Sequence, residues 1–484
     1  MNLTLQQRCI CDGAVRAANA GGHIKIIAGA GTGKTSTLIS VAKALRAADA
    51  KTKILYLAYN RPIMLDARNK FSGLSDVFTL HSLAYRMLSI HKQRERIDTL
   101  YPKHIKLALK LPEYEFGLSD RQLARCLLSL LHAFCNSALN RPDPSMLPNG
   151  LKKQLGQEGA DWCMDKTWKL LQFLSPFNPK GHKYPLPHDV YLKIWQLSGS
   201  PGVSEYSTVL LDEAQDANPL IIDTLARARH AVFVGDSHQQ IYQFRGAVDA
   251  MTALPGEEYP LTQSFRWGQR IADLANSILA MKSVPPRYCL SGDPHLNTRI
   301  EPLDTRYSHA RIYRTNSALV HDALAMQDLG RDPEVVGDRH DFVRLLRSLV
   351  QLQAGPSFRG RRVSHPALEP FDSWQDLQNA IENDDEISVD IRSAVNTIED
   401  HGARLPELIT LLERKSSGHR LQLTTAHKSK GLEWDQCLVV NDFDRILTKV
   451  KPNERDHELN LLYVATTRAR SRLEIQSPYV QALL

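Results

Sequence analysis

The chain has 484 residues, too many for a single hydrophobic core, and a prior of roughly 150 residues per domain predicts about three or four compact units. Its 60 Lys and Arg residues against 53 Asp and Glu residues give a net charge of +7, which is compatible with a polyanionic partner without identifying one. No signal-peptide pattern and no run of about 18 apolar residues is present, so we expect no membrane span and a cytoplasmic protein.

The seven cysteines are scattered along the chain and include no paired C-x-x-C spacing. This pattern argues against a zinc site or an iron–sulfur cluster. An odd number of cysteines, without a secretory context, is typical of a reducing compartment.

Short apolar runs alternate with polar loops and helical patterns along much of the chain. The first runs lie at residues 24–28, 54–58, 208–211 and 231–234, and residues 36–47 are typical of a helix. A second set lies at residues 310–313, 421–424, 436–440 and 472–475. This alternation predicts an α/β protein with two lobes, each a parallel sheet covered by helices.

Two stretches do not follow the alternation and are mainly helical in pattern. We interpret residues 85–200 as an insertion into a first lobe formed by residues 1–84 and 201–258. Residues 345–418 are likewise interpreted as a smaller insertion into a second lobe, formed by residues 259–344 and 419–484.

The sequence AGAGTGKT follows the first apolar run and opens the predicted helix, which is the context that a phosphate-binding P-loop requires. Its glycines allow backbone N–H groups to surround a phosphate, Lys34 supplies a positive charge, and the Thr35 hydroxyl is suited to Mg²⁺. A chance glycine turn is the alternative. The predicted nucleotide-binding residues here are Ala28, Gly29, Ala30, Gly31, Thr32, Gly33, Lys34, Thr35 and Ser36.

A second acidic motif, VLLDEAQD, ends another apolar run. A carboxylate at the carboxyl end of a buried strand can hold Mg²⁺ through water, and we assign this role to Asp212. The adjacent Glu213 is predicted to orient and deprotonate an attacking water. An exposed acidic turn without a catalytic role is the alternative.

These two motifs belong to a longer ordered series that resembles the UvrD/Rep-type superfamily 1 helicases. The further segments are LTLQQ near the start, TLHS, GDSHQQIYQFRGA, QSFR, TAHKSKGLE and LYVATTRAR. The sequences of several segments are similar to those of the helicase core of the F-box DNA helicases. No F-box is recognised before the first motif, so no ubiquitin-ligase partner is expected.

The resemblance implies two RecA-like P-loop NTPase lobes that bind ATP and Mg²⁺. It implies that Arg266 and Arg468 approach the γ-phosphate as arginine fingers and that Gln239 senses this phosphate. Gln7 would read the adenine, Phe265 would stack on it, and Glu433 would bond the ribose. The alternatives are surface ion pairs for the arginines, a core position for Phe265 and a helix-surface position for Gln7. Ser36 departs from the arginine common at this position, which predicts a looser nucleotide preference.

The resemblance also implies a channel for single-stranded DNA, held by stacking and phosphate contacts. Two departures affect this channel: Phe244 stands where a tryptophan is common, and the segment LAYNRP shifts the aromatic residue next to Asn60. Core packing is the alternative for Tyr242, Phe244 and His427. The residues predicted to contact DNA are Tyr59, Asn60, His81, Tyr242, Phe244, Arg245 and His427.

The expected function is an ATP-dependent single-stranded DNA translocase and helicase, moving 3′ to 5′ on single-stranded, tailed or forked DNA. Repair, recombination or phage-related processing in a bacterial or phage-encoded setting is the expected context. The alternative is an ATP-gated DNA-binding subunit of a larger complex, for example a nuclease-containing repair or anti-phage defence complex, with little unwinding alone. The basic run at residues 91–96 is interpreted as a solvated helix face rather than a duplex-binding patch.

Overall fold

The structure is a computed structural model that describes residues 3–241, 250–337, 339–355, 365–368, 371, 373–383, 389–414, 420–448 and 452–484. The chain divides into two compact units. The first comprises Met1–Ala28 and Gly33–Leu261, and the second comprises Gly29–Thr32 and Thr262–Leu484.

A parallel sheet lies at the centre of the first unit. Its six described strands follow the order β3-β2-β6-β7-β1-β8, and every neighbouring pair is parallel. The four apolar runs predicted in this part of the chain are all strands, which confirms the predicted α/β class here. The strands are β1 (His23–Ala28), β2 (Ile54–Ala58), β3 (Asp76–Thr79), β6 (Thr208–Leu211), β7 (Ala231–Gly235) and β8 (Glu257–Leu261).

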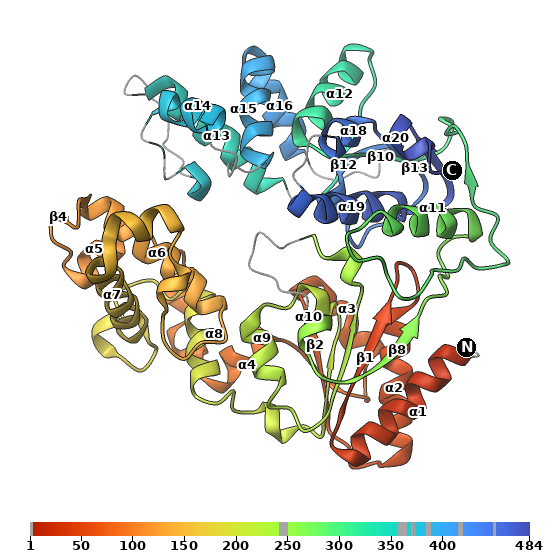
Figure 1. Ribbon diagram of the computed structural model, residues 1–484, viewed down its shortest axis with the longest axis horizontal. Coiled ribbons are helices and arrows are strands. Elements are labelled where there is room, and N and C mark those ends of the chain that lie inside the picture. Colours follow the sequence, from red (N-terminus) through yellow and green to blue (C-terminus); the bar gives the residue numbers. More distant parts are fainter. Residues whose placement is uncertain are drawn as a thin grey trace. The chain divides into compact units, whose positions relative to one another are not determined.

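Helices cover both faces of this sheet (Figure 1). On one face, apolar side chains of α1 to α3, such as Ile10, Leu38 and Ala67, form a core with alternate strand residues such as Tyr56 and Leu210. On the other face, Leu57 and Leu211 belong to a larger core that continues into the helical segment of this unit. The helices beside the sheet are α1 (Leu5–Ala20), α2 (Lys34–Ala48), α3 (Arg61–Lys70), α4 (Leu80–Met87), α9 (Pro219–Leu225) and α10 (Ala250–Ala253).

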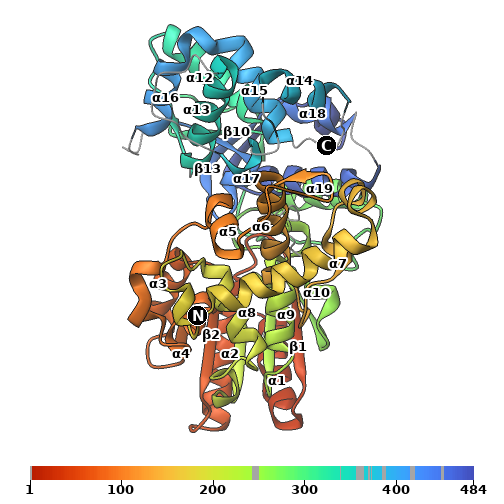
Figure 2. The ribbon, with the colours of Figure 1, turned by 90° about the vertical axis from the view of Figure 1, so that its left-hand side faces the viewer.

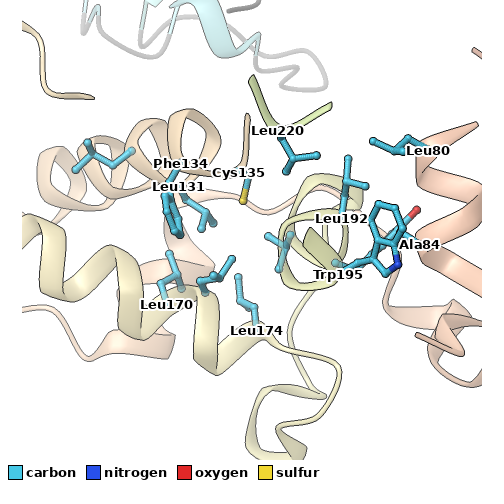
Figure 3. Close-up of a cluster of buried hydrophobic side chains, with 14 of the residues drawn as sticks. Leu80, Ala84, Leu131, Phe134, Cys135, Leu170, Leu174, Leu192, Trp195 and Leu220 are labelled. Atoms are coloured by element: carbon cyan, nitrogen blue, oxygen red, sulfur yellow. The ribbon is translucent and has the colours of Figure 1, made fainter. Parts of the chain in front are cut away.

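The helical segment between β3 and β6 packs around α6, which contacts α5, α7 and α8 (Figure 2). Figure 3 shows Phe134 of α6, Leu170 and Leu174 of α7 and Trp195 of α8 in its core. Because this core is continuous with that of the sheet, the segment and the sheet are one compact unit. Its elements are α5 (Pro102–Leu109), β4 (Tyr114–Glu115), β5 (Leu118–Ser119), α6 (Asp120–Asn136), α7 (Asn149–Leu174) and α8 (His188–Leu197).

The second unit contains another parallel sheet. Its six described strands follow the order β11-β12-β10-β13-β14-β9, again with parallel neighbours throughout. The four apolar runs predicted here are likewise strands. The strands are β9 (Arg299–Ile300), β10 (His309–Tyr313), β11 (Glu334–Val335), β12 (Leu421–Thr425), β13 (Trp434–Val439) and β14 (Ala469–Ile475).

Helices of the second unit fall into two groups. One group packs around a core that includes Leu324, Leu346, Val395 and Leu408, together with Leu423 of the sheet. This group contains α12 (Asn316–Asp328), α13 (His340–Ala354), α14 (Trp374–Asn383), α15 (Val389–His401) and α16 (Leu405–Glu413). The other helices are α11 (Gln269–Ala280), α17 (Ala426–Ser429), α18 (Asp442–Leu447), α19 (Pro452–Thr466) and α20 (Pro478–Gln481). In the part of the chain that is described, no helix has the length and apolar character that crossing a membrane requires.

Candidate active site

The glycine-rich turn between β1 and α2 has the backbone that its sequence predicts. Gly31 and Gly33 adopt left-handed φ angles of 70° and 77°, which are strained for residues with a Cβ atom. Gly33 precedes the first helical residue, Lys34, and no side chain caps this end of α2. The first N–H groups of the helix are therefore suited to bind an anion, which fits the phosphates of ATP.

Lys34 and Glu213 form an ion pair in the first unit, with the Lys34 Nζ atom 3.0 Å from Glu213 Oε1 and 3.2 Å from Glu213 Oε2. Burial lowers the pKa of Lys34, but the carboxylates of Glu213, Asp236 and Asp212 outweigh it, so that the pKa is raised. Lys34 therefore stays positively charged at neutral pH, as a phosphate ligand must.

Thr35 and Asp212 meet next to this ion pair. The Thr35 hydroxyl donates to Asp212 Oδ2 at 3.0 Å, and the backbone N–H of Glu213 donates to Asp212 Oδ1 at 2.9 Å. Asp212 is 4% exposed, and its burial, followed by the charge of Glu213, raises the pKa of its carboxyl group. A hydroxyl and a carboxylate oxygen are the ligand types that Mg²⁺ prefers, so these residues fit the predicted metal role.

The order of the strands explains why these residues meet. The P-loop follows β1, the acidic motif follows β6, and β7 lies between these two strands. Since all three strands are parallel, the loops that follow them emerge at the same edge of the sheet, where ligands of open α/β sheets bind.

A hydrogen-bond network behind Glu213 was not predicted from the sequence. Gln215 donates to Glu213 Oε2 at 2.5 Å and accepts a bond from the backbone N–H of Asp236 at 3.0 Å. Asp236 in turn accepts a bond from the Gln239 side chain at 2.8 Å. Gln215 and Asp236 lie within motifs recognised in the sequence, but their partners depend on β6 and β7 being neighbours.

Gln7 lies at the start of α1 and is largely buried. Its side-chain oxygen accepts a bond from the backbone N–H of Thr4 at 3.1 Å, and its amide group donates to the Thr37 hydroxyl at 3.2 Å. Gln7 therefore ties α1 to α2 close to the P-loop, while its contact with adenine stays a prediction.

In the second unit, two candidate nucleotide residues, Arg266 and Glu433, form an ion pair. Arg266 Nε lies 2.7 Å from Glu433 Oε2, and Arg470 also pairs with this carboxylate. Burial raises the pKa of Glu433, but its bonds and charge interactions with Arg470 and Arg266 outweigh this effect and lower it. Phe265 is 44% exposed and is therefore not a core residue. Its role in stacking stays a prediction, as does the ribose contact of Glu433.

Arg468 is only 1% exposed, and its guanidinium group donates to oxygen atoms of its own unit. These acceptors are the carbonyl groups of Val464 at 2.8 Å and Leu432 at 3.2 Å and the Thr467 hydroxyl at 3.0 Å. Its role as an arginine finger stays a prediction.

The described residues predicted to contact DNA have different environments. Tyr59, the residue after β2, is 38% exposed, and the Asn60 side chain caps α3 by accepting a bond from the Ile63 N–H at 3.0 Å. His81 pairs with Asp189, with 3.3 Å between His81 Nε2 and Asp189 Oδ1. His427 is half-buried in the second unit. Tyr242, Phe244 and Arg245 lie outside the described residues, so their predicted roles are untested.

The basic run at residues 91–96 is mostly exposed, as interpreted from the sequence, except for Arg96. The Arg96 guanidinium group is buried and donates to the carbonyl groups of Tyr184, Leu174 and Gly181 at 3.2, 3.0 and 3.1 Å. Arg96 is therefore a structural residue of the helical segment.

Comparison with known families places two matches on this chain. Residues 12–245 match the AAA domain, and residues 375–478 match the UvrD-like helicase C-terminal domain. The first match includes the P-loop and the acidic motif, and the second includes Glu433 and Arg468.

Among individual proteins, the F-box DNA helicase protein 1 of Schizosaccharomyces pombe is 31% identical over 97% of this chain and 57% of its own length. The F-box DNA helicase 1 of Gallus gallus is 28% identical over 93% of this chain and 47% of its own length. A probable DNA helicase II homolog of Mycoplasma pneumoniae is 26% identical over 54% of this chain and 41% of its own length. The chain thus spans about half the length of the curated relatives it matches.

Proposed function

Because this chain belongs to the UvrD-like superfamily 1 helicases, we propose that it hydrolyses ATP to move along single-stranded DNA and to separate duplex strands. The observation that carries this proposal is the pairing of Lys34 with Glu213 beside the pairing of Thr35 with Asp212. The four side chains supply the charges and oxygen ligands that phosphoryl transfer from ATP to water requires.

In the proposed reaction, the uncapped first turn of α2 and Lys34 bind the phosphates. Lys34 then exchanges its bond to Glu213 for a bond to phosphate, which leaves the Glu213 carboxylate to accept a proton from the attacking water. Thr35 and Asp212 would hold Mg²⁺, which neutralises phosphate charge when it is bound.

Arg266 and Arg468 are proposed to stabilise the negative charge that develops on the transferred phosphoryl group. Gln239 is proposed to sense that group, and its bond to Asp236 links it to the network behind Glu213. The support for these three roles is the position of each residue in its motif.

The proposed DNA contacts are the exposed aromatic ring of Tyr59, together with Asn60, His81 and His427, and with Tyr242, Phe244 and Arg245 of the motif after β7. The expected direction of movement is 3′ to 5′, by likeness to the family. Repair or recombination is the proposed context.

A direct test is the ATPase rate of the purified chain with and without single-stranded DNA. We expect stimulation of at least about 10-fold by single-stranded DNA and little stimulation by blunt duplex, because the strand is proposed to bind as part of the catalytic cycle. An ATPase rate that is indifferent to DNA would contradict the proposal.

A second proposal is that the chain is an ATP-gated DNA-binding subunit of a larger complex, such as one that contains a nuclease. The helical group inserted between β11 and β12 is small compared with that of full-size UvrD-type enzymes. Because this region is expected to engage duplex DNA, its small size favours the second proposal. DNA-stimulated ATP hydrolysis without strand separation, together with a copurifying partner, would support this second proposal.

A further inference from the structure

Tyr56 lies in the middle of β2 and is absent from the motifs recognised in the sequence. Its side chain is 0% exposed, although it carries a polar hydroxyl group. In the sheet, Tyr56 is the register partner of Leu210 in the neighbouring strand β6, which ends one residue before Asp212. The two strands therefore bring a buried phenol next to the proposed Mg²⁺ carboxylate.

The Tyr56 hydroxyl donates a hydrogen bond to Asp212 Oδ2, with 2.8 Å between the oxygen atoms. Thr35 donates to the same oxygen at 3.0 Å, and the Glu213 N–H donates to Oδ1 at 2.9 Å. An ionised carboxylate has about four lone-pair directions. Asp212 accepts three hydrogen bonds from described residues, so three of its lone-pair directions are occupied.

The Tyr56 ring is itself held in place. It packs against Phe71 with 4.4 Å between ring centroids and belongs to the core on the helix α1 side of the sheet. A ring fixed in this way keeps its hydroxyl oxygen within hydrogen-bond distance of Asp212. Thr35 differs, because its oxygen keeps lone pairs for a metal while its O–H group donates to Asp212.

We propose that Tyr56 is a positioning residue for Mg²⁺, which fixes the Asp212 carboxylate so that its remaining lone pair faces the metal's ligand shell. This inference rests on the proposed function, since it requires that the site bind Mg²⁺ with a nucleotide. Hydrogen bonds to a metal-ligating carboxylate orient it, and their loss typically lowers metal affinity about 10- to 100-fold.

The test compares Tyr56→Phe with the wild-type chain, because this substitution removes only the hydroxyl group. Binding of a fluorescent, non-hydrolysable ATP analogue is measured by anisotropy, first in EDTA and then over a series of Mg²⁺ concentrations. We expect unchanged affinity in EDTA and a roughly 10-fold increase in the Mg²⁺ concentration needed for half-maximal tightening. This readout does not depend on turnover.

Tyr313→Phe is the matched control. Tyr313 is a buried tyrosine of β10 whose hydroxyl donates to Asp322 in the second unit, so its loss also removes a buried Tyr–Asp bond. We expect thermal unfolding to shift similarly in both variants, while only Tyr56→Phe alters the Mg²⁺ dependence.

If Tyr56→Phe and the wild-type chain require the same Mg²⁺ concentration within about 2-fold, Tyr56 is only a structural residue and the inference is wrong. A wild-type chain that binds the analogue without any Mg²⁺ dependence, or not at all, refutes the proposed function first and the inference with it. The Mg²⁺ dependence of the wild-type chain therefore tests the proposed function, and the difference between Tyr56→Phe and the wild-type chain tests the inference.

Discussion

At the scale of single residues, Glu213 combines a strained backbone with a carboxylate whose orientation is fixed. Its φ angle of 54° places a non-glycine residue in the left-handed region, where strain is on the order of 1 kcal/mol or more. Its carboxylate is also held by Lys34 and Gln215, which fix its orientation. A carboxylate held in this way is already oriented before the nucleotide binds.

Replacing Glu213 with Gln tests whether this carboxylate is the general base. An amide of the same shape cannot accept a proton from water, so we expect ATP turnover to fall at least about 100-fold. ATP binding should be retained or become tighter, because Lys34 no longer has to leave a carboxylate partner. Turnover is measured by phosphate release, and binding with the fluorescent ATP analogue.

Glu205→Gln is the matched control, because Glu205 is exposed and lies outside the proposed site. Its turnover should equal that of the wild-type chain. Near-normal hydrolysis by Glu213→Gln would show that another group activates the water.

Arg96 illustrates what charge patterning does not reveal about a single residue. The run HKQRER is typical of a solvated helix face, and most of its residues are exposed. Arg96 is buried because the end of α7 and the turn that follows bring the carbonyl groups of Leu174 and Gly181 within reach of its guanidinium group. These carbonyl groups lie about eighty residues further along the chain. The sequence near Arg96 therefore does not predict these contacts.

At the scale of elements, the central strands were predictable and the edge strands were not. The eight predicted runs are the strands β1, β2, β6, β7, β10, β12, β13 and β14, all in interior positions of the two sheets. Strands buried on both faces need continuous apolar runs, which makes them recognisable. Within these two parallel sheets, the four described strands that were not predicted, β3, β8, β9 and β11, are the edges.

The edge strands lack such runs for physical reasons. An edge strand has a neighbour on one side only, so it tolerates shorter length, charges and proline. β8 has the sequence EEYPL, and β9 and β11 have two residues each. Their existence depends on the strand beside them rather than on their own pattern.

A buried charge cluster connects α17 and α19 with β10 in the second unit. Just after β10, Arg314 forms a bidentate pair with Glu458, with distances of 2.6 and 2.7 Å, and both side chains are buried. His427 of α17 lies beside this pair, and its ring is 6.0 Å from that of His457. Burial, followed by the charges of Arg314, His457 and Lys428, outweighs the opposing effect of Glu458 and lowers the pKa of His427 to about 3.

This depressed pKa predicts that the second unit loses stability between pH 6.5 and pH 5. In this range the unfolded chain protonates His427 but the folded unit does not, so acid favours unfolding. The loss from this residue is at most about 2 kcal/mol at pH 5, taking an unfolded pKa of about 6.5. Urea unfolding of the wild-type chain and of His427→Gln at several pH values measures it.

We expect His427→Gln to show a weaker pH dependence than the wild-type chain between pH 5 and 6.5. Between pH 7 and 8 the two proteins should respond alike, because His427 is neutral in both states there. Glu458 does not affect the pH dependence between pH 5 and 6.5. Its pKa is lowered to about 2, so its contribution to the free energy of unfolding is lost only in stronger acid. Equal slopes from pH 5 to 6.5 would contradict the prediction.

At the scale of the whole molecule, the order of the motifs allowed the family to be recognised, while the network among them required the fold. Lys34, Thr35, Asp212 and Glu213 belong to sequence motifs that can be recognised one by one. Tyr56, Gln215 and Asp236 join them only because β2, β6 and β7 are adjacent in one sheet. A side chain that only positions another functional side chain cannot be recognised from a single sequence.

The direction of movement is a property of the whole motor, and we predict 3′ to 5′. A motor of this polarity should displace streptavidin from a biotinylated 5′ end of single-stranded DNA, and leave it bound at a 3′ end. It should also unwind duplexes with a 3′ tail and leave those with a 5′ tail intact. Both assays use ATP, with Glu213→Gln as the inactive control.

Together the two assays separate movement from strand separation. Displacement at the 5′ end with unwinding of 3′-tailed duplexes supports a helicase, because movement in one direction then also separates the strands. Displacement without unwinding would favour the second proposal, in which a partner supplies the duplex-separating element. Displacement only from the 3′ end would reverse the predicted polarity, since a motor removes an obstacle only from the end toward which it moves.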